Sequence, residues 1–191
     1  MTAKRSPDSI ADATCLHRRN FLKLGVFAAA SLLAAPAFAK IGPLRDRPLA
    51  FYNMHTGESL RTDYWAAGRY IPEGLAEINY ILRDHRTNEV KAIDPSLLDL
   101  LYALRLNLGS RQAFHIISGY RSPATNAFLH AHSNGVATHS LHMDGMAADI
   151  FLPDRSLHTL RAAAVELGRG GVGYYPASNF VHVDVGRVRY W

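Results

Sequence analysis

Hydrophobic positions along residues 40–191 recur with two different periods, which predict a mixture of helices and strands. Residues 49–65 form two alternating, aromatic-rich runs around Thr56 and Gly57, the pattern of a β-hairpin. Apolar residues at helical spacing predict helices over 73–86, 94–109, 123–130 and 156–168. Apolar runs bounded by turn residues predict strands within 114–122, 146–152, 171–176 and 180–186. Helices early in the chain and antiparallel neighbours late in it indicate the α+β class.

The first 39 residues differ from the rest and predict an export signal. Arg18 and Arg19, followed by Phe-Leu-Lys, resemble the twin-arginine signal of bacteria. The apolar run that follows has 16 residues, fewer than the ~20 of a bilayer span, and it ends in a small-x-small cleavage site at 37–39. We therefore expect residues 1–39 to be removed after passage through the twin-arginine translocation machinery. Residues 40–191 would then be a single periplasmic domain without a stable membrane span. Retention of the segment as an anchor is the alternative.

Charge and cysteine content narrow the class of protein further. The net charge of the whole chain is +5, but residues 1–39 hold five Lys or Arg and two Asp, which leaves +2 for residues 40–191. A net charge this small does not indicate a nucleic-acid partner. Cys15 is the only cysteine and lies in the predicted signal, so the domain would contain no disulfide.

Chemistry-bearing residues gather in the last quarter of the chain. In residues 180–186, alternation puts three valines on one strand face, and His182 and Asp184 on the other. Residues 139–149 place His142 and Asp149 seven positions apart, and Gly145 between them allows the chain to bend. Two histidines and one carboxylate form the ligand set of a catalytic metal that keeps one position open, and zinc is its usual occupant. A half-exposed polar strand and a polar loop are the alternative reading of these residues.

Three stretches carry a resemblance to a known family: SGYRSPATN (118–126), SLHMDGMAAD (140–149) and GGVGYYPASNFVHVDVGRVRYW (170–191). Together they resemble the exported M15-type peptidases of the murein endopeptidase K family, relatives of the D-Ala-D-Ala peptidases and of the hedgehog signalling domain. The resemblance implies a central, mostly antiparallel sheet with flanking helices. It also implies one zinc ion on His142, Asp149 and His182, and cleavage of peptide cross-links in peptidoglycan.

Further roles follow from the same resemblance. Arg121 matches an arginine that faces the metal and steadies a substrate carboxylate or a developing oxyanion. Ser140 is a candidate substrate-binding residue or a structural turn serine. The general base is not evident, because Asn179 and Phe180 stand where related enzymes carry it. Asp184 is our candidate for this catalytic role, and its alternative role is to orient His182. Asp144 and His139 are the next candidates.

Three functions remain open from the sequence. A zinc-dependent murein endopeptidase is the reading that we favour. A D,D-carboxypeptidase would use the same site but needs room on one side of the metal. A zinc-stabilised cell-wall-binding module without turnover would explain the missing base, but it would not need Arg121.

Overall fold

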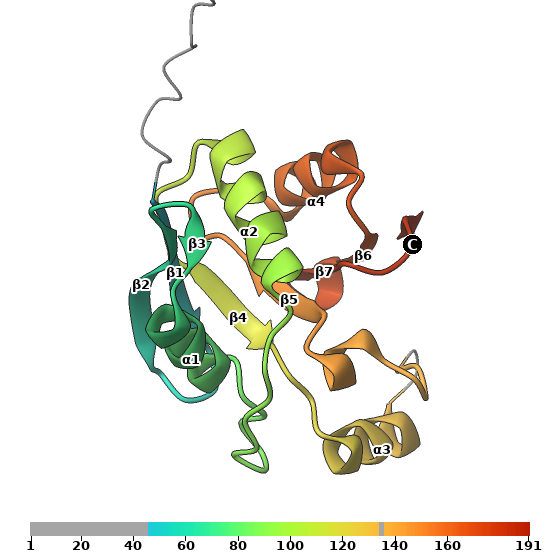
Figure 1. Cartoon of the computed structure of the whole chain (residues 1–191). Coiled ribbons are helices and arrows are strands. Elements are labelled where there is room, and N and C mark those ends of the chain that lie inside the picture. Colours follow the sequence, from blue (N-terminus) through green and yellow to red (C-terminus); the bar gives the residue numbers. More distant parts are fainter. Residues whose placement is uncertain (1–45, 134–135) are drawn as a thin grey trace, which may run out of the picture. The chain divides into compact units, whose positions relative to one another are not determined.

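One mixed sheet of eight strands, in the order β3-β2-β1-β4-β5-β7-β6-β8, organises residues 46–133 and 136–191, which the computed structural model describes (Figure 1). The strands are β1 (Arg47–Asn53), β2 (Ser59–Ala66), β3 (Arg69–Tyr70), β4 (Phe114–Ser118), β5 (Ala147–Phe151), β6 (Gly171–Tyr175), β7 (Phe180–Asp184) and β8 (Arg189–Tyr190). The β1–β4 and β6–β8 pairs are parallel, and the other five neighbouring pairs are antiparallel. The expected α+β class with a mostly antiparallel sheet is thus confirmed. The predicted export signal, residues 1–39, lies outside the described residues.

Four α-helices and two short 3-10 helices accompany the sheet within the part of the chain that the structure describes. They are α1 (Pro72–Ile81), α2 (Pro95–Leu108), α3 (Pro123–His132), α4 (Leu157–Leu167), η1 (Leu141–Asp144) and η2 (Pro176–Ser178). Helices α2 and α4 pack against each other, α2 contacts β1, and α4 contacts β6 and β7 (Figure 1). Helix α1 packs against β2, whereas α3 follows the end of β4 and lies apart from α2 and α4 (Figure 1). The helices therefore flank the sheet, as expected.

A local sequence signal sets the start of α2, whereas tertiary contacts set the end of α1. Helix α2 begins after Asp94, whose side chain accepts a hydrogen bond from Ser96 N, as the sequence predicts. Helix α1 was expected to continue to residue 86, and this prediction is wrong, because the helix ends at Ile81. Asp84 is buried beyond its end, and its carboxylate accepts hydrogen bonds from the backbone N–H groups of Arg86 and Ser122. These contacts tie the segment after α1 to the turn that follows β4.

The hydrophobic core lies between the sheet and the helices α1, α2 and α4. Its fully buried side chains come from both layers and include Leu49, Phe51, Phe114, Ile116, Ile150, Val181 and Val183 of the strands and Ile78, Leu97, Leu98, Leu101, Leu104 and Leu160 of the helices. Strand β7 shows the predicted alternation, since both of its valines are fully buried. That burial fixes which face of β7 its His182 occupies.

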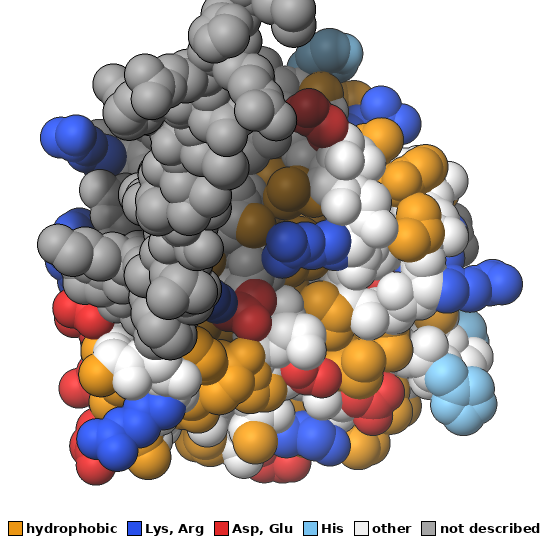
Figure 2. All heavy atoms as spheres, turned by 45° about the horizontal axis from the view of Figure 1, so that its top comes forward, with side chains coloured by type: hydrophobic (Ala, Val, Ile, Leu, Met, Phe, Trp, Pro, Cys, Tyr) orange, Lys and Arg blue, Asp and Glu red, His pale blue; other side chains and the backbone are white. Residues whose placement is uncertain are grey.

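The surface carries charges of both signs. On the face in Figure 2, the visible described residues show Lys and Arg side chains interspersed with Asp, Glu and apolar groups rather than gathered into one stripe. Among residues 46–133 and 136–191, no helix combines the length and hydropathy that crossing a membrane requires.

Candidate metal centre and active site

Two of the predicted metal ligands face each other across neighbouring strands. Asp149 of β5 and His182 of β7 are directly paired in the antiparallel β5–β7 ladder, and Asp149 Oδ1 lies 2.9 Å from His182 Nδ1. Opposed residues in such a ladder have side chains on the same face, so the pairing itself brings carboxylate and imidazole together. The register of the sheet therefore brings two of the three predicted ligands together.

The third predicted ligand, His142, reaches the same place from the short helix η1. Gly145 ends η1 in a left-handed conformation, with φ of 70°, and a Cβ at this position would lie 2.5 Å from the carbonyl oxygen of Ala92. Glycine is required there for both reasons, and the bend allows the chain to turn from η1 into β5. The bend predicted at Gly145 is confirmed, and it brings His142 and Asp149 to one site.

The spacing of the three ligand atoms suits a metal ion. His142 Nε2 lies 3.3 Å from Asp149 Oδ1 and 3.2 Å from His182 Nδ1. Ligands of a tetrahedral zinc ion at ~2.0–2.1 Å are roughly 3.3 Å apart, so the observed separations need little adjustment. All three residues are largely buried, and among the described residues they form the one group of His, Cys, Asp or Glu side chains close enough to share an ion. The donor set, two nitrogens and one oxygen, fits zinc.

Each histidine directs a defined nitrogen toward the centre. His142 Nδ1 lies 2.7 Å from the carbonyl oxygen of Gly119, so this nitrogen carries the proton and Nε2 is free to bind. His182 uses the reverse arrangement, because its Nε2 lies 3.0 Å from Asp184 Oδ2 and its Nδ1 faces Asp149. The two imidazoles thus present opposite nitrogens, each fixed by an acceptor behind the ring.

The electrostatics of the site favour a cation at its centre. Burial opposes the ionisation of Asp149, but the charges and hydrogen bonds of His142 and His182 hold the pKa of this carboxyl well below its usual range. Burial also opposes protonation of His182, yet the hydrogen bonds and charges of Asp149 and Asp184 outweigh it and raise the pKa of His182 to about 9. Negative charge is therefore concentrated around the imidazoles.

Arg121 is the predicted cationic neighbour of this centre. Its Nη2 lies 3.6 Å from Asp149 Oδ2, and its backbone N–H donates to the carbonyl oxygen of His142 at 3.1 Å. Its contacts with Asn126 and Ser118 are 3.4 Å long, and Nε is buried without a hydrogen-bond partner among the described residues. Burial lowers the pKa of Arg121, and Asp149 opposes this shift. A buried guanidinium with unused donors is suited to an anionic ligand.

Asp184 lies behind His182 and is fully buried. Besides His182, it accepts hydrogen bonds from the backbone N–H groups of Gly171 and Gly186, at 3.0 and 2.9 Å. Arg189 donates to both carboxylate oxygens, at 3.1 and 2.7 Å. These donors outweigh burial and hold the pKa of Asp184 well below its usual range. Both oxygens are therefore occupied, and the carboxylate contacts the ring nitrogen that faces away from Asp149.

A cavity of about 330 Å³ opens over the centre, and its lining includes His142, Asp149, His182, Arg121 and Ser140. All of the predicted site residues except Asp184 thus line one cavity. The Ser140 hydroxyl caps η1, lying 3.4 Å from His142 N, so its structural role is visible while its predicted role toward substrate is untested.

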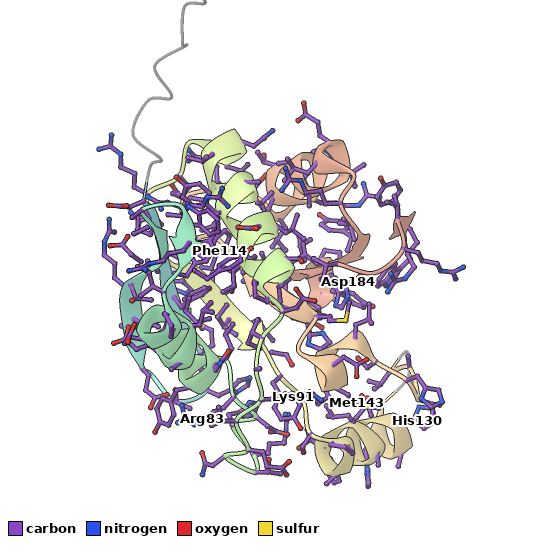
Figure 3. All side chains as sticks on the ribbon, in the orientation of Figure 1. Arg83, Lys91, Phe114, His130, Met143 and Asp184 are labelled. Carbon is purple, nitrogen blue, oxygen red and sulfur yellow. The ribbon has the colours of Figure 1, made fainter. Side chains whose placement is uncertain are left out.

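The remaining acid–base candidates occupy different places. His139 is exposed and lines the cavity, whereas Asp144 is exposed and is not part of the lining. His130 lies on α3, away from Asp184 (Figure 3), and its Nδ1 lies 2.7 Å from the carbonyl oxygen of Val136.

Sequence reasoning did not identify Arg189 or Trp191, both of which line the cavity. Arg189 belongs to β8, which pairs with β6, and Trp191 follows it. The signal for these residues is weak, because a two-residue strand has no readable periodicity. Only the concentration of Arg and aromatic side chains in the last residues of the chain marks them.

Comparison with known proteins identifies relatives that span nearly the whole chain. Residues 43–191 match the family model described as Peptidoglycan L,D-endopeptidase MepK, within the M15 peptidases. A peptidoglycan L,D-endopeptidase MepK of Escherichia coli K12 is 47% identical over 176 residues, which cover 92% of this chain and 97% of the relative. A probable peptidoglycan L,D-endopeptidase MepK of Haemophilus influenzae is 41% identical over 177 residues, covering 92% and 95% of the two chains.

Proposed function

Because the chain belongs to the peptidoglycan L,D-endopeptidase MepK family of M15 peptidases, we propose that it hydrolyses peptide cross-links of peptidoglycan with one zinc ion. The ion would be held by His142 Nε2, Asp149 Oδ1 and His182 Nδ1. The names of the relatives indicate that the cleaved bond joins an L-configured centre to a D-configured one. The preformed three-atom ligand set beside Arg121 is the observation that carries this proposal.

The residues around the candidate metal centre would have different roles in amide hydrolysis. Zinc bound there would supply Lewis acidity, which polarises a carbonyl and promotes the ionisation of water. Arg121, which lines the cavity, would donate from its guanidinium to the oxyanion that develops at the scissile carbonyl, or to a substrate carboxylate. Ser140 would add a hydrogen bond to substrate from the rim of the cavity.

Asp184 would act through His182. We expected Asp184 either to transfer protons or to orient His182, and its geometry supports the orienting role. Both of its oxygens accept hydrogen bonds, and it contacts Nε2 of His182 rather than the candidate metal centre. It would fix the ring so that Nδ1 points at the metal. Proton transfer would then fall to His139, an exposed imidazole in the cavity lining, since imidazole is the side chain that most often transfers protons in enzymes.

The alternatives have less support. A D,D-carboxypeptidase acts on a terminal residue between D-centres, whereas the family is named for an internal L,D bond. A binding module without turnover gives no reason for a largely buried arginine that lines the cavity beside the ligand set. An L,D-endopeptidase is consistent with the family's name and also gives a role to Arg121.

Peptidoglycan lies outside the cytoplasm, so the function requires export. We infer that residues 1–39 form a twin-arginine signal, cleaved after Ala39, and that residues 40–191 act in the periplasm. Arg18, Arg19 and the small-x-small site support this inference.

The proposed function is tested by digestion of purified peptidoglycan. The zinc-loaded protein should release new muropeptides, resolved by chromatography, and mass spectrometry should assign the cleaved bond as an L,D cross-link. The chelated protein should release none. Release only of terminal D-alanine would instead identify a carboxypeptidase, and binding without release would identify a binding module.

A further inference from the structure

Aromatic side chains form one wall of the cavity over the candidate metal centre. Tyr175, Phe180 and Trp191 all line it. Tyr175 and Phe180 are directly paired between β6 and β7, and their rings stack at a centroid distance of 4.6 Å and an angle of 21°. The Trp191 ring lies 5.3 Å from the ring of His182. We call these three residues the aromatic wall.

The indole of Trp191 is held firmly although 46% of the residue is exposed. Its backbone N–H donates to the carbonyl oxygen of Val172 at 3.2 Å, and its carbonyl oxygen accepts from Tyr174 N at 3.0 Å. Its Nε1 donates to the Tyr175 hydroxyl at 2.7 Å. Arg189 lies over the ring, 4.9 Å from its centroid. An exposed aromatic side chain with this many fixed contacts is preorganised for a ligand.

Gly173 makes the position of the indole possible. A Cβ at this residue would lie 2.7 Å from Cε2 and 2.8 Å from Nε1 of Trp191, and 2.8 Å from Cε2 of Tyr175. Only a glycine leaves this space, so β6 is built to admit the two rings. The aromatic wall is therefore a feature of the sheet and not a chance exposure.

The wall and Arg121 lie on different sides of the centre. Strands β5 and β7 carry Asp149 and His182, and in the sheet order they are flanked by β4 on one side and by β6 and β8 on the other. Arg121 follows β4, whereas Trp191 follows β8. A substrate that crosses the centre from one flank to the other would meet a cationic group on one side and an apolar surface on the other.

We propose that the aromatic wall is the subsite for the stem-peptide residue on one side of the scissile bond, and that it packs against the methylene groups of that residue. The proposal rests on the proposed function and specifies its substrate. A residue of extended peptide spans at most ~3.6 Å, so a group in contact with Trp191 lies within about two residues of a bond cleaved at the centre. Its ligand is therefore peptide and not the glycan strand.

The kinetic test compares Trp191→Ala, Trp191→Phe and Tyr190→Ala on a purified cross-linked muropeptide dimer. Trp191→Ala should raise KM about tenfold or more, the order expected for losing contact with one aromatic ring, with kcat changed less than about threefold. Trp191→Phe should recover most of the loss. Tyr190 is the matched control, because it is adjacent, equally exposed at 46%, and its hydroxyl contacts the carbonyl oxygen of Val165.

Zinc affinity separates a substrate contact from structural support of His182. If Trp191→Ala binds zinc within about threefold of the wild type while KM rises, the subsite is supported. Loss of zinc affinity in parallel with activity would overturn it, as would an unchanged KM in Trp191→Ala.

A binding experiment tests the same subsite without turnover. The chain has two tryptophans, so a Trp65→Phe variant reports Trp191 alone. In the chelated protein, the dimer should change the Trp191 emission saturably, and the peptide-free disaccharide should not. A response to the disaccharide alone, or no response to the dimer, would overturn the proposal. Failure of the wild type to cleave peptidoglycan would instead reject the proposed function, and this titration would still report on the wall.

Discussion

Asp149 and His182 are paired residue to residue across β5 and β7, with Asp149 Oδ1 2.9 Å from His182 Nδ1. The strands that carry them are held in register by buried apolar residues on their inner side, so the pair does not depend on a loop. His142 completes the set from η1. The site is accordingly built on rigid elements, and single ligand changes should affect metal binding more than folding.

Asp184→Asn tests whether this carboxylate orients His182 or transfers protons. If it orients the ring, zinc affinity should fall about 10–100-fold, because Asn cannot hold the Nε2 proton as a carboxylate does. Excess zinc should then restore most of the activity. Competition with a chelator measures affinity, and muropeptide release at saturating zinc measures catalysis.

A general-base role of Asp184 would give a different result. Unchanged zinc affinity, with a loss of turnover on the order of 10²–10⁴-fold at saturating zinc, would make Asp184 the general base. Ser110→Ala is a suitable control, since Ser110 bonds a different carboxylate, Asp154, away from the cavity lining.

The grouping of the three candidate ligands could be predicted because strand alternation and a glycine bend are local signals. Strand alternation placed His182 opposite the buried valines, and Gly145 indicated the bend that the structure contains. Asp184 was placed correctly on the strand, but its full burial was not foreseen. Gly171 and Arg189, which surround it, are 13 and 5 residues away, and only the pairing of β6 with β7 and β8 brings them together.

The end of α1 could not be predicted either, because it also depends on residues that are distant in the sequence. Apolar spacing through Leu82 favours a helix, and nothing nearby in the sequence stops it before residue 86. Contacts from Asp84 to Ser122, 38 residues later, stop it instead. Tertiary hydrogen bonds of this kind override local propensity, and a single sequence carries no sign of them.

Asp84 should make stability pH-dependent in the acid range. Burial raises the pKa of Asp84, but hydrogen bonds from Thr125, Ser122 and Arg86 outweigh it and lower the pKa from 3.8 to about 2. A lowered pKa stabilises the folded state fully above the unfolded value and loses this effect as the pH falls through the folded one. The contribution should therefore disappear between about pH 4 and pH 2.

Asp84→Asn isolates this effect. The difference in unfolding free energy between wild type and variant, measured by denaturant titration of the chelated proteins, should be largest near neutral pH and shrink below about pH 4. A difference that stays constant down to pH 2 would contradict the role given to Asp84.

Export should depend on the arginine pair. Replacement of Arg18 and Arg19 by lysine should leave the precursor in the cytoplasm, because the pair is read by a receptor rather than by its charge alone. Fractionation of cells followed by immunoblotting measures the distribution, with Lys4→Arg as a charge-conserving control outside the signal stretch. Normal amounts of the Lys-Lys protein in the periplasm would show that the signal is of another type.

The central claim is that one zinc ion on His142, Asp149 and His182 performs peptidoglycan hydrolysis, and a zinc titration of the chelated protein tests it most directly. Muropeptide release should rise with added zinc and reach its plateau at one equivalent per chain. His142→Ala should bind little zinc and release no muropeptides, while its circular dichroism stays that of the wild type and His130→Ala behaves normally. Full release by the chelated protein, or one tightly bound zinc per chain in His142→Ala, would contradict the assignment.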